Sequence, residues 1–299
     1  MSGGRRVAVC GLGVMGTGVA GRLLETGAEV RVWNRTARRA TALGDAGATV
    51  CATPAEAARG AEAVLLCLAD AEALRAVLQG EQGVLAALPA DALLICASTV
   101  SPADVAALAG RGGVVDAGLL GNGDHARTGE LRIFLGGAPE DVERAAELVA
   151  GLAKQIVPVG PLGSGMRLKL LMNLLMGIEM QAMAEAAALA TAQGLDRTAV
   201  LRAIAASGFA SPVMRFKTER MTGERWDDPD FRLRLMHKDL RLVTEEAAAA
   251  GISLPMASAA ADTHAQAVAE GLGDADCAAI ARVLAPAAVP AASGSGRDH

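Results

Sequence analysis

The first strand-like run of the chain leads directly into a glycine-rich turn, and this junction constrains the fold more than any other feature. Residues 6–10 are mostly apolar and are followed by Gly11-Leu12-Gly13-Val14-Met15-Gly16 and then by a helical pattern. In such a turn Gly11 permits the tight bend, Gly13 lets the backbone approach a pyrophosphate, and Gly16 lets helix and strand pack closely. The amides at the helix N-terminus would face the phosphate charge. The strand–turn–helix context predicts a dinucleotide-binding domain.

Strand-like and helical runs alternate up to about residue 159. Several of the strands are almost entirely aliphatic, which is typical of a sheet covered on both faces. The alternation predicts an α/β fold with a doubly wound, mostly parallel sheet. The expected strands are 6–10, 29–33, 63–68, 92–96, 113–117, 131–135 and 155–159, and the expected helices between them are 16–26, 54–58, 71–78, 102–109 and 138–151.

The pattern changes after residue 163, where no convincing strand follows. A long helix is expected over residues 164–193, joining the two domains, and shorter helices over 196–207, 212–222, 232–250 and 255–270. Pro161 and its neighbouring glycines mark a boundary. We therefore expect a Rossmann domain over residues 1–162, an all-α domain over 163–286, and a disordered Ala/Pro/Ser/Gly-rich tail over 287–299.

Composition excludes several classes of protein. The net charge is -5, which argues against a surface for nucleic acids. Every long apolar run is interrupted by polar residues, whereas a membrane span needs about 20 mostly apolar residues. The five cysteines are scattered without a CxxC pair, which argues against a disulfide framework or a zinc site and favours reduced thiols. No metal is expected, and the sequence favours a cytoplasmic enzyme.

The end of the second predicted strand indicates which dinucleotide is bound. It is followed by Asn34, Arg35 and Thr36, with Arg38 and Arg39 close behind. An NAD-selective site usually carries an acidic residue here, about 20 residues after the first glycines, to bind the ribose 2′-hydroxyl. A guanidinium and a hydroxyl suit a 2′-phosphate, which a carboxylate would repel. This predicts NADP(H) over NAD(H), and one of Arg38 and Arg39 is expected to lie on a solvated helix face instead.

The long helix carries a narrow stripe of polar or small residues. Lys169, Asn173, Gly177 and Gln181 recur every four residues and so share one side of the helix. The remaining positions are largely Leu, Met and Ile, the pattern of a helix buried on every side. A single helical lysine is most often solvated, but here it is expected to face an internal cleft. Ser164 with its flanking glycines is expected to form a flexible cap.

Several ordered motifs together show a family resemblance, which extends from about residue 6 to residue 284. The chain resembles the β-hydroxyacid dehydrogenase family, the group of 3-hydroxyisobutyrate dehydrogenase, tartronate semialdehyde reductase and the glyoxylate/succinic semialdehyde reductases. The matching segments are GLGVMGTGVA at 11–20, NRT at 34–36, STVSP at 98–102, DAGLLGNGDHARTGELRIFLGG at 116–137, GSGMRLKLLMN at 163–173 and FRLRLMHKDL at 231–240.

The resemblance implies roles for individual residues. Lys169 matches the catalytic lysine, a general acid, and Asn173 matches a residue that holds substrate beside it. Lys238 and Asp239 match a motif near the active site. The resemblance also implies a Rossmann domain, an all-α second domain resembling that of 6-phosphogluconate dehydrogenase, and a homodimer. The implied reaction is hydride transfer between a nicotinamide cofactor and a CH–OH or carbonyl group.

The motifs and the resemblance together predict a set of site residues. Ser98 and Thr99 follow a buried strand, at the edge where open α/β sheets bind ligands, and Ser101 is equally typical of a helix cap. The expected cofactor-binding residues are Gly11, Leu12, Gly13, Val14, Met15, Gly16, Asn34, Arg35, Thr36, Cys67, Leu68, Thr99 and Lys238. The expected substrate-binding residues are Ser98, Leu120, Gly121, Asn122, Lys238 and Asp239.

The segment that binds substrate in the family departs from its usual DAPVSGG pattern. Leu120 stands where the family has a serine hydroxyl, and Asn122 replaces a glycine. A leucine donates no hydrogen bond, so either Asn122, Ser98 and Lys238 bind the substrate's anionic group, or the substrate presents an apolar group to Leu120. His125 is a further candidate donor, although an exposed loop histidine is the more common situation. Met172 and Ala97 also replace family residues.

Three functions are compatible with these residues. The first is an NADPH-dependent reductase of aldehydes or 2-oxo acids, which Lys169 favours. The second is an imine reductase of the related group, which shares an apolar residue in the substrate loop but generally lacks the lysine. The third is a non-catalytic NADPH-binding protein, which loss of Lys169 would have indicated.

Overall fold

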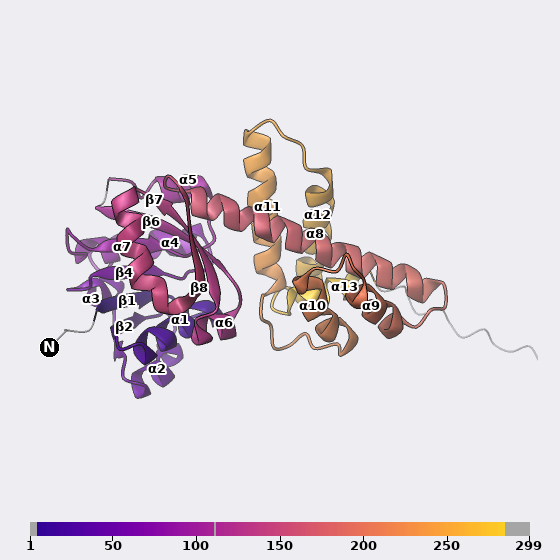
Figure 1. The fold of residues 1–299 in the computed structure, drawn as a ribbon, viewed down its shortest axis with the longest axis horizontal. Coiled ribbons are helices and arrows are strands. Elements are labelled where there is room, and N and C mark those ends of the chain that lie inside the picture. The colour runs from indigo at the N-terminus through magenta and orange to yellow at the C-terminus, as the bar shows by residue number, and fades with distance from the viewer. Residues whose placement is uncertain (1–4, 111, 285–299) are drawn as a thin grey trace, which may run out of the picture. The chain divides into compact units, whose positions relative to one another are not determined.

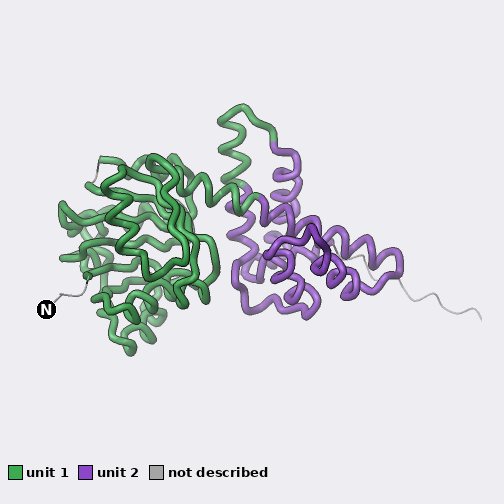
Figure 2. Tube along the Cα trace, viewed as in Figure 1, with its two compact units in different colours: residues 1–174, 241–253 green, residues 175–240, 254–299 purple. Residues whose placement is uncertain are grey.

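The computed structural model describes residues 5–110 and 112–284, which form two compact units (Figure 2). Of the described residues, the first unit comprises 5–110, 112–174 and 241–253, and the second comprises 175–240 and 254–284. The expected division into domains at residues 162 and 163 stays a prediction. The expected tail, residues 287–299, lies outside the described residues.

A single eight-stranded sheet forms the centre of the first unit, with strand order β3-β2-β1-β4-β5-β6-β7-β8 (Figure 1). Every neighbouring pair is parallel except β6 and β7, which are antiparallel. This confirms the expected doubly wound, mostly parallel Rossmann sheet. The strands are β1 (Arg6–Cys10), β2 (Glu29–Trp33), β3 (Thr49–Val50), β4 (Ala63–Leu66), β5 (Leu93–Cys96), β6 (Gly113–Leu120), β7 (Leu131–Gly137) and β8 (Ala153–Gly160).

Both faces of the sheet are buried beneath helices. Along β1, Val7 and Val9 belong to one hydrophobic cluster, whereas Ala8 and Cys10 belong to another, because successive side chains of a strand point to opposite faces. The first cluster includes residues of α1 (Val14–Glu25), α2 (Thr41–Asp45), α6 (Gly123–Thr128) and α7 (Pro139–Val149). The second includes residues of α3 (Pro54–Ala58), α4 (Ala71–Leu78) and α5 (Pro102–Ala106).

Strand β6 is three residues longer than expected. Its end pairs antiparallel with β7, which joins Gly118 to Phe134, Leu119 to Ile133 and Leu120 to Arg132. The glycine and the turn that follows interrupt the aliphatic pattern, so the sequence gives no strand signal there. The short strand β3 and the helix α6 were also not expected, and β4 ends two residues earlier than expected.

The long helix expected after the sheet is confirmed as α8 (Ser164–Ala192). The expectation that it is buried on every side is wrong in part. Leu171, Leu175 and Leu189 are 51%, 56% and 61% exposed, because no other segment among the described residues covers these positions. Met166, Leu170, Met180 and Met183 are buried.

Helices make up the second unit, and among the described residues after β8 there is only an isolated bridge between Arg232 and Asp276. They are the later part of α8, α9 (Arg197–Ala206), α10 (Pro212–Thr222), the first part of α11 (Leu233–Ala249), α12 (Pro255–Ala267) and α13 (Ile280–Val283), with the short helical segments Val268–Leu272 and Cys277–Ala279. Their core contains Met183, Leu201, Met221, Trp226 and Leu233. Within the described residues, no helix combines the length and the apolarity that crossing a bilayer would require.

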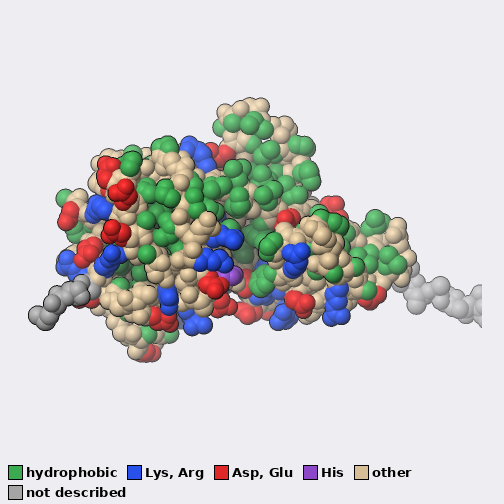
Figure 3. Space-filling view, viewed as in Figure 1, with side chains coloured by type: hydrophobic (Ala, Val, Ile, Leu, Met, Phe, Trp, Pro, Cys, Tyr) green, Lys and Arg blue, Asp and Glu red, His purple; other side chains and the backbone are tan. Residues whose placement is uncertain are grey.

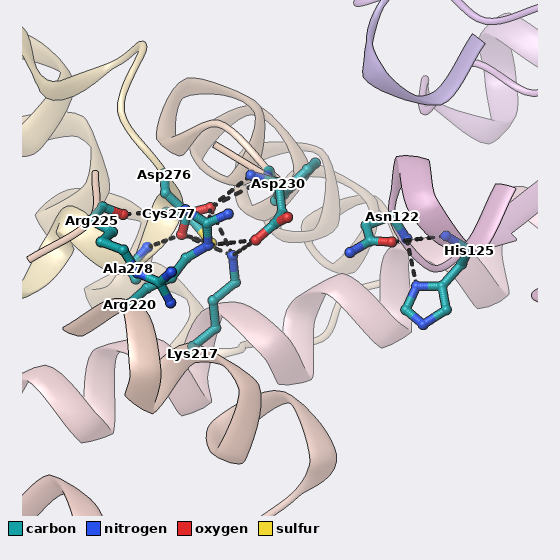
Figure 4. Close-up of polar contacts among 10 residues, drawn as sticks. Asn122, His125, Lys217, Arg220, Arg225, Asp230, Asp276, Cys277 and Ala278 are labelled. Atoms are coloured by element: carbon teal, nitrogen blue, oxygen red, sulfur yellow. Dashed lines mark hydrogen bonds and ion pairs between the residues drawn. The ribbon is translucent and has the colours of Figure 1, made fainter. Parts of the chain in front are cut away.

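An ionic cluster in the second unit, the Asp276 cluster, consists of the buried Lys217 and Asp276 with the partly exposed Arg220 and Asp230 (Figure 4). Lys217 donates to both oxygens of Asp276 at 2.8 Å, and its residue is 3% exposed. The Asp276 carboxylate also accepts the backbone N–H groups of Asp230 and Ala278 at 3.1 and 3.0 Å. One carboxylate thereby connects α10, the segment before α11, and the start of the Cys277–Ala279 segment.

Candidate cofactor and catalytic site

The three glycines of the turn between β1 and α1 have different environments. Gly11 has φ +99°, and a Cβ atom there would lie 2.4 Å from the carbonyl oxygen of Cys67. A Cβ atom at Gly16 would lie 1.9 Å from the carbonyl oxygen of Gly11. Gly13 is exposed, and among the described residues, its two chain neighbours aside, no atom lies within 4 Å of the position its Cβ would take. Packing therefore requires glycine at positions 11 and 16, whereas no described neighbour requires a glycine at position 13.

Asn34 connects the end of β2 to this turn. Its Oδ1 accepts the backbone N–H of Leu12 at 2.9 Å, and its Nδ2 donates to the carbonyl oxygen of Thr36 at 3.0 Å. Arg35 and Thr36, which follow it, are exposed. Within the described part of the chain, the guanidinium groups of Arg35, Arg38 and Arg39 make no hydrogen bond and no ion pair. The end of β2 thus presents exposed cationic groups beside the glycine turn.

Ser98 lies at the ends of β4 and β5. Its side chain is buried, and its Oγ donates to the carbonyl oxygen of Leu66 at 2.9 Å while accepting the N–H of Leu68 at 2.8 Å. These bonds hold the Cys67–Leu68 backbone, against which Gly11 packs. Burial raises the pKa of the Cys67 thiol to about 12, so this residue stays protonated. The substrate-binding role of Ser98 stays a prediction.

The segment after β6 is more ordered than expected, because Asn122 and His125 cap α6 reciprocally (Figure 4). The Oδ1 of Asn122 accepts the N–H of His125 at 3.0 Å, and the Nδ1 of His125 accepts the N–H of Asn122 at 3.2 Å. A neutral imidazole that accepts at Nδ1 carries its proton on Nε2, which points away from Asn122. A Cβ atom at Gly123 would lie 2.7 Å from Cγ1 of Val14. This capped pair therefore lies beside the start of α1.

Lys169 lies where the beginning of α8 packs against the end of β6. A Cβ atom at Gly118 would lie 3.0 Å from the Cβ of Lys169 and 2.5 Å from the carbonyl oxygen of Gly165. Lys169 is half-buried, and Asn173, one turn later on the same side, is buried. The absence of a side chain at Gly118 is what lets the two elements approach this closely.

Asp116, which sequence reasoning missed as a site residue, caps α8. Its Oδ1 accepts the N–H of Gly163 at 2.7 Å, and its Oδ2 accepts the N–H of Met166 at 2.5 Å. The cap expected from Ser164 is thus supplied by a side chain of β6. The available signal was an acidic residue in the middle of an apolar strand. Ser101 does cap α5, because its Oγ accepts the N–H of Asp104 at 3.0 Å.

The remaining expected residues lie in both units. Lys238 and Asp239 of α11 belong to the second unit and form an ion pair at 2.7 Å, in which Asp239 is buried. Gly177, from the polar stripe of α8, packs against Leu240, since a Cβ there would lie 2.8 Å from that side chain. Thr99 is half-buried, and Leu120 is half-buried at the end of β6. Gly121 has φ +140°.

Two protein families match this chain, and several curated and solved proteins are similar to it. Residues 6–160 match the family described as the NAD binding domain of 6-phosphogluconate dehydrogenase, and residues 163–284 match NAD-binding of NADP-dependent 3-hydroxyisobutyrate dehydrogenase. The chain is 34% identical to a 3-sulfolactaldehyde reductase of Escherichia coli, over 92% of this chain and 94% of that protein. A solved 3-hydroxyisobutyrate dehydrogenase of Mycobacterium tuberculosis with L-serine is 27% identical, with a TM-score of 0.81 over 94% of this chain and 99% of that chain.

A Rossmann sheet with an open glycine turn defines a dinucleotide-binding domain, and the two matching families identify the protein as an oxidoreductase that uses a nicotinamide cofactor. The chain belongs to the β-hydroxyacid dehydrogenase family. Its reaction is accordingly the interconversion of a CH–OH group and a carbonyl group by hydride transfer.

The imine reductase alternative has a structural counterpart as well. An imine reductase from a Pseudomonas species is 22% identical to this chain, with a TM-score of 0.60 over 94% of this chain and 99% of that chain. At that identity the match shows a shared fold. The reductase and dehydrogenase relatives are the closer match to this sequence.

Proposed function

We propose that this protein is an NADPH-dependent reductase of small aldehydes or 2-oxo acids that carry an acidic group, with Lys169 as its general acid. The observation that carries the proposal is the placement of Lys169 against Gly118, at the carboxyl end of a strand in an open α/β sheet. Ligands of such sheets bind outside the carboxyl ends of the strands. The reductase and dehydrogenase relatives support the carbonyl substrate.

The residues of the glycine turn fit the proposed cofactor. The space at Gly13 and the start of α1, where no side chain caps the helix, would accept a pyrophosphate. Arg35, Arg38 and Arg39 would bind a 2′-phosphate without first breaking an ion pair. When bound, the dihydronicotinamide supplies a hydride to the carbonyl carbon of the substrate.

The chain's own contribution to the chemistry comes from Lys169. Negative charge develops on the carbonyl oxygen during reduction, and an ammonium group stabilises that charge and supplies the proton. Half-burial of Lys169 strengthens this interaction, since the local dielectric is lower than in water. Asn173, one turn along α8, would orient the lysine or hold the substrate oxygen.

Asn122 and His125 supply the donors that Leu120 cannot. The Oδ1 of Asn122 and the Nδ1 of His125 are engaged in the capping of α6, so the Asn122 amide NH₂ and the His125 Nε2–H are the remaining donors. Neither makes a hydrogen bond to another described residue. We assign these two donors to the acidic group of the substrate, as a substitute for the family's serine and glycines.

Replacing Gly13 with alanine tests the cofactor site without disturbing the fold. We expect the Kd for NADPH to rise about 10- to 100-fold, because the methyl group would displace the pyrophosphate from a charge-assisted hydrogen bond worth about 1.5–3 kcal/mol. Gly13 has φ -76°, which alanine adopts readily, so thermal stability should be unchanged or slightly raised. Titration of NADPH fluorescence measures the Kd.

Gly208→Ala is the matched control, since its Cβ position is also open and it lies in the second unit. Its Kd should equal that of the unmodified protein. An unchanged Kd in Gly13→Ala would contradict the assignment of the pyrophosphate to this turn.

The function itself is tested by following NADPH oxidation with glyoxylate, succinic semialdehyde, larger 2-oxo acids and cyclic imines. We expect turnover of an aldehyde or oxo acid, with kcat/KM at least about tenfold higher for NADPH than for NADH, the factor that one charge-assisted contact supplies. A clear preference for NADH would refute the cofactor assignment. Turnover of cyclic imines alone would establish the imine reductase alternative, and stoichiometric NADPH binding without any turnover would establish a binding protein.

The other expectations concern partners and location. On the face drawn in Figure 3, acidic and basic side chains are interspersed, which agrees with the net charge of -5. The homodimer and the cytoplasmic location stay predictions. The exposed Leu175 and Leu189 of α8 are apolar positions that a second copy would cover.

A further inference from the structure

The start of α8 is fixed by a buried carboxylate from the middle of β6. Asp116 is 0% exposed, and each of its oxygens accepts one backbone N–H of the helix start, from Gly163 at 2.7 Å and from Met166 at 2.5 Å. A negative group is favourable at a helix N-terminus, where the free N–H groups carry partial positive charge. Each oxygen accepts a hydrogen bond, so the carboxylate restrains the start of α8 through two backbone N–H groups.

Glycines surround this carboxylate and leave no room for other side chains. A Cβ atom at Gly136 would lie 2.4 Å from Oδ1 of Asp116, and one at Gly165 would lie 3.0 Å from Oδ2 and 2.9 Å from the Asp116 carbonyl oxygen. Burial raises the pKa of the Asp116 carboxyl, and the N–H bonds from Gly163 and Met166 oppose that rise. The group is thus built into the contact between sheet and helix and has no access to bulk water.

The contact between β6 and α8 continues from Asp116 to the catalytic lysine, Lys169. Gly118 lies two residues after Asp116 and therefore on the same face of β6. The backbone of Gly118 packs against the Cβ of Lys169. Lys169 follows Met166 by three residues, which is almost one turn of helix. The stretch from Gly163 to Lys169 is consequently held by two neighbouring points of one strand.

We propose that Asp116 is a positioning residue that fixes Lys169 for proton transfer, an inference that rests on the proposed catalytic role of Lys169. The carboxylate sets the position and direction of the first turn of α8, and Gly118 sets how closely that turn approaches the sheet. In this role Asp116 would touch neither substrate nor cofactor, because it is buried and both of its oxygens are bonded to α8. It acts through the backbone of α8.

Asp116→Asn is the sharpest change, because it keeps the shape and replaces one acceptor oxygen with an NH₂ group that faces an N–H donor. We expect kcat to fall about 10- to 100-fold, the effect of a displacement of about 1 Å in a catalytic group, while the Kd for NADPH stays within about twofold. Asp196→Asn is the control, since Asp196 caps α9 through the N–H of Ala199 at 2.7 Å and belongs to the second unit.

A double-variant cycle separates positioning from general damage to the fold. If Asp116 acts only through Lys169, the variant with both Asp116→Asn and Lys169→Ala should be no slower than Lys169→Ala alone. If the double variant instead shows the product of the two separate losses in kcat, the inference is overturned while the role of Lys169 remains intact.

A direct observation of Lys169 makes the inference independent of turnover. The sequence contains four lysines, Lys154, Lys169, Lys217 and Lys238, so ¹³C-methylated lysines give few NMR signals and the Lys169 signal is identified by its loss in Lys169→Ala. We expect the chemical shift of the Lys169 signal to change in Asp116→Asn and to stay unchanged in Asp196→Asn. An unshifted signal in Asp116→Asn would overturn the inference. A normal rate in Lys169→Ala would instead remove the proposed catalytic role, and the NMR result would still decide whether Asp116 positions this lysine.

Discussion

Replacement of Lys169 with alanine should lower kcat for carbonyl reduction by about 10²- to 10⁴-fold, the usual contribution of a positioned general acid. The variant loses both the proton donor and the positive charge that stabilises the developing alkoxide. Stability should change little, because the lysine is only half-buried and its Cβ remains in contact with β6. Steady-state kinetics with NADPH and the best carbonyl substrate measure the effect, and fluorescence titration should show an unchanged Kd for NADPH.

Two further variants separate the two functions of the lysine. Lys154→Ala removes an exposed lysine from β8 and should leave kcat unchanged. Lys169→Arg keeps the positive charge but offers a group that does not release its proton near neutral pH, so its rate should stay well below that of the unmodified protein. If Lys169→Ala reduces substrate at the normal rate while remaining folded, the proton comes from another group and the proposed mechanism is wrong.

Features that depend on local pattern were predictable from the sequence. The bounds of β1 and β2 agree with the expected strands, because a parallel strand covered on both faces is a short aliphatic run. The helices α4 and α10 also begin and end where expected, since Asp70 and Ser211 cap them through the N–H groups of Ala73 and Met214. The glycine turn was predictable because its motif is a pattern of local spacing, within which Gly16 packs against Gly11.

Features that depend on distant contacts were not predictable. The bonds from Asp116 to the start of α8 join residues 47 and 50 positions apart, and those of Ser98 join residues 30 and 32 positions apart. A single sequence shows an acidic residue in a strand or a serine after one, and either pattern is compatible with a ligand-binding side chain. The structure shows that both side chains hold backbone segments near the expected site.

The reciprocal cap of Asn122 and His125 illustrates an intermediate case. Asn followed three residues later by a side chain that reaches back is a capping signal, but histidine is an unusual partner in that position. His125 was therefore expected to be an exposed loop residue, and α6 was not expected at all. The cap fixes which ring nitrogen carries the proton, and this detail is what makes the proposed substrate contact specific.

The largest expected effect on stability belongs to Asp276. We expect Asp276→Ala to lower the free energy of unfolding of the second unit by about 3–5 kcal/mol, because it leaves the buried Lys217 ammonium without its closest partner. Asp230 would remain, at 3.7 Å from Lys217. Urea unfolding followed by tryptophan fluorescence in a Trp33→Phe background measures this unit specifically, since Trp226, the second of the two tryptophans, lies in its core.

Two comparisons establish that the effect comes from the unpaired buried charge. Asp274→Ala removes a carboxylate that is 75% exposed from its contacts with Arg232 and Arg234, two residues before Asp276 in the chain, and should cost less than about 1 kcal/mol. Adding Lys217→Met to Asp276→Ala removes the unpaired ammonium and should recover part of the loss, because a buried ion pair replaced by apolar side chains often costs little. If the double variant is no more stable than Asp276→Ala, the hydrogen bonds from Asp276 to the Asp230 and Ala278 backbone, rather than the ion pair, hold these segments together.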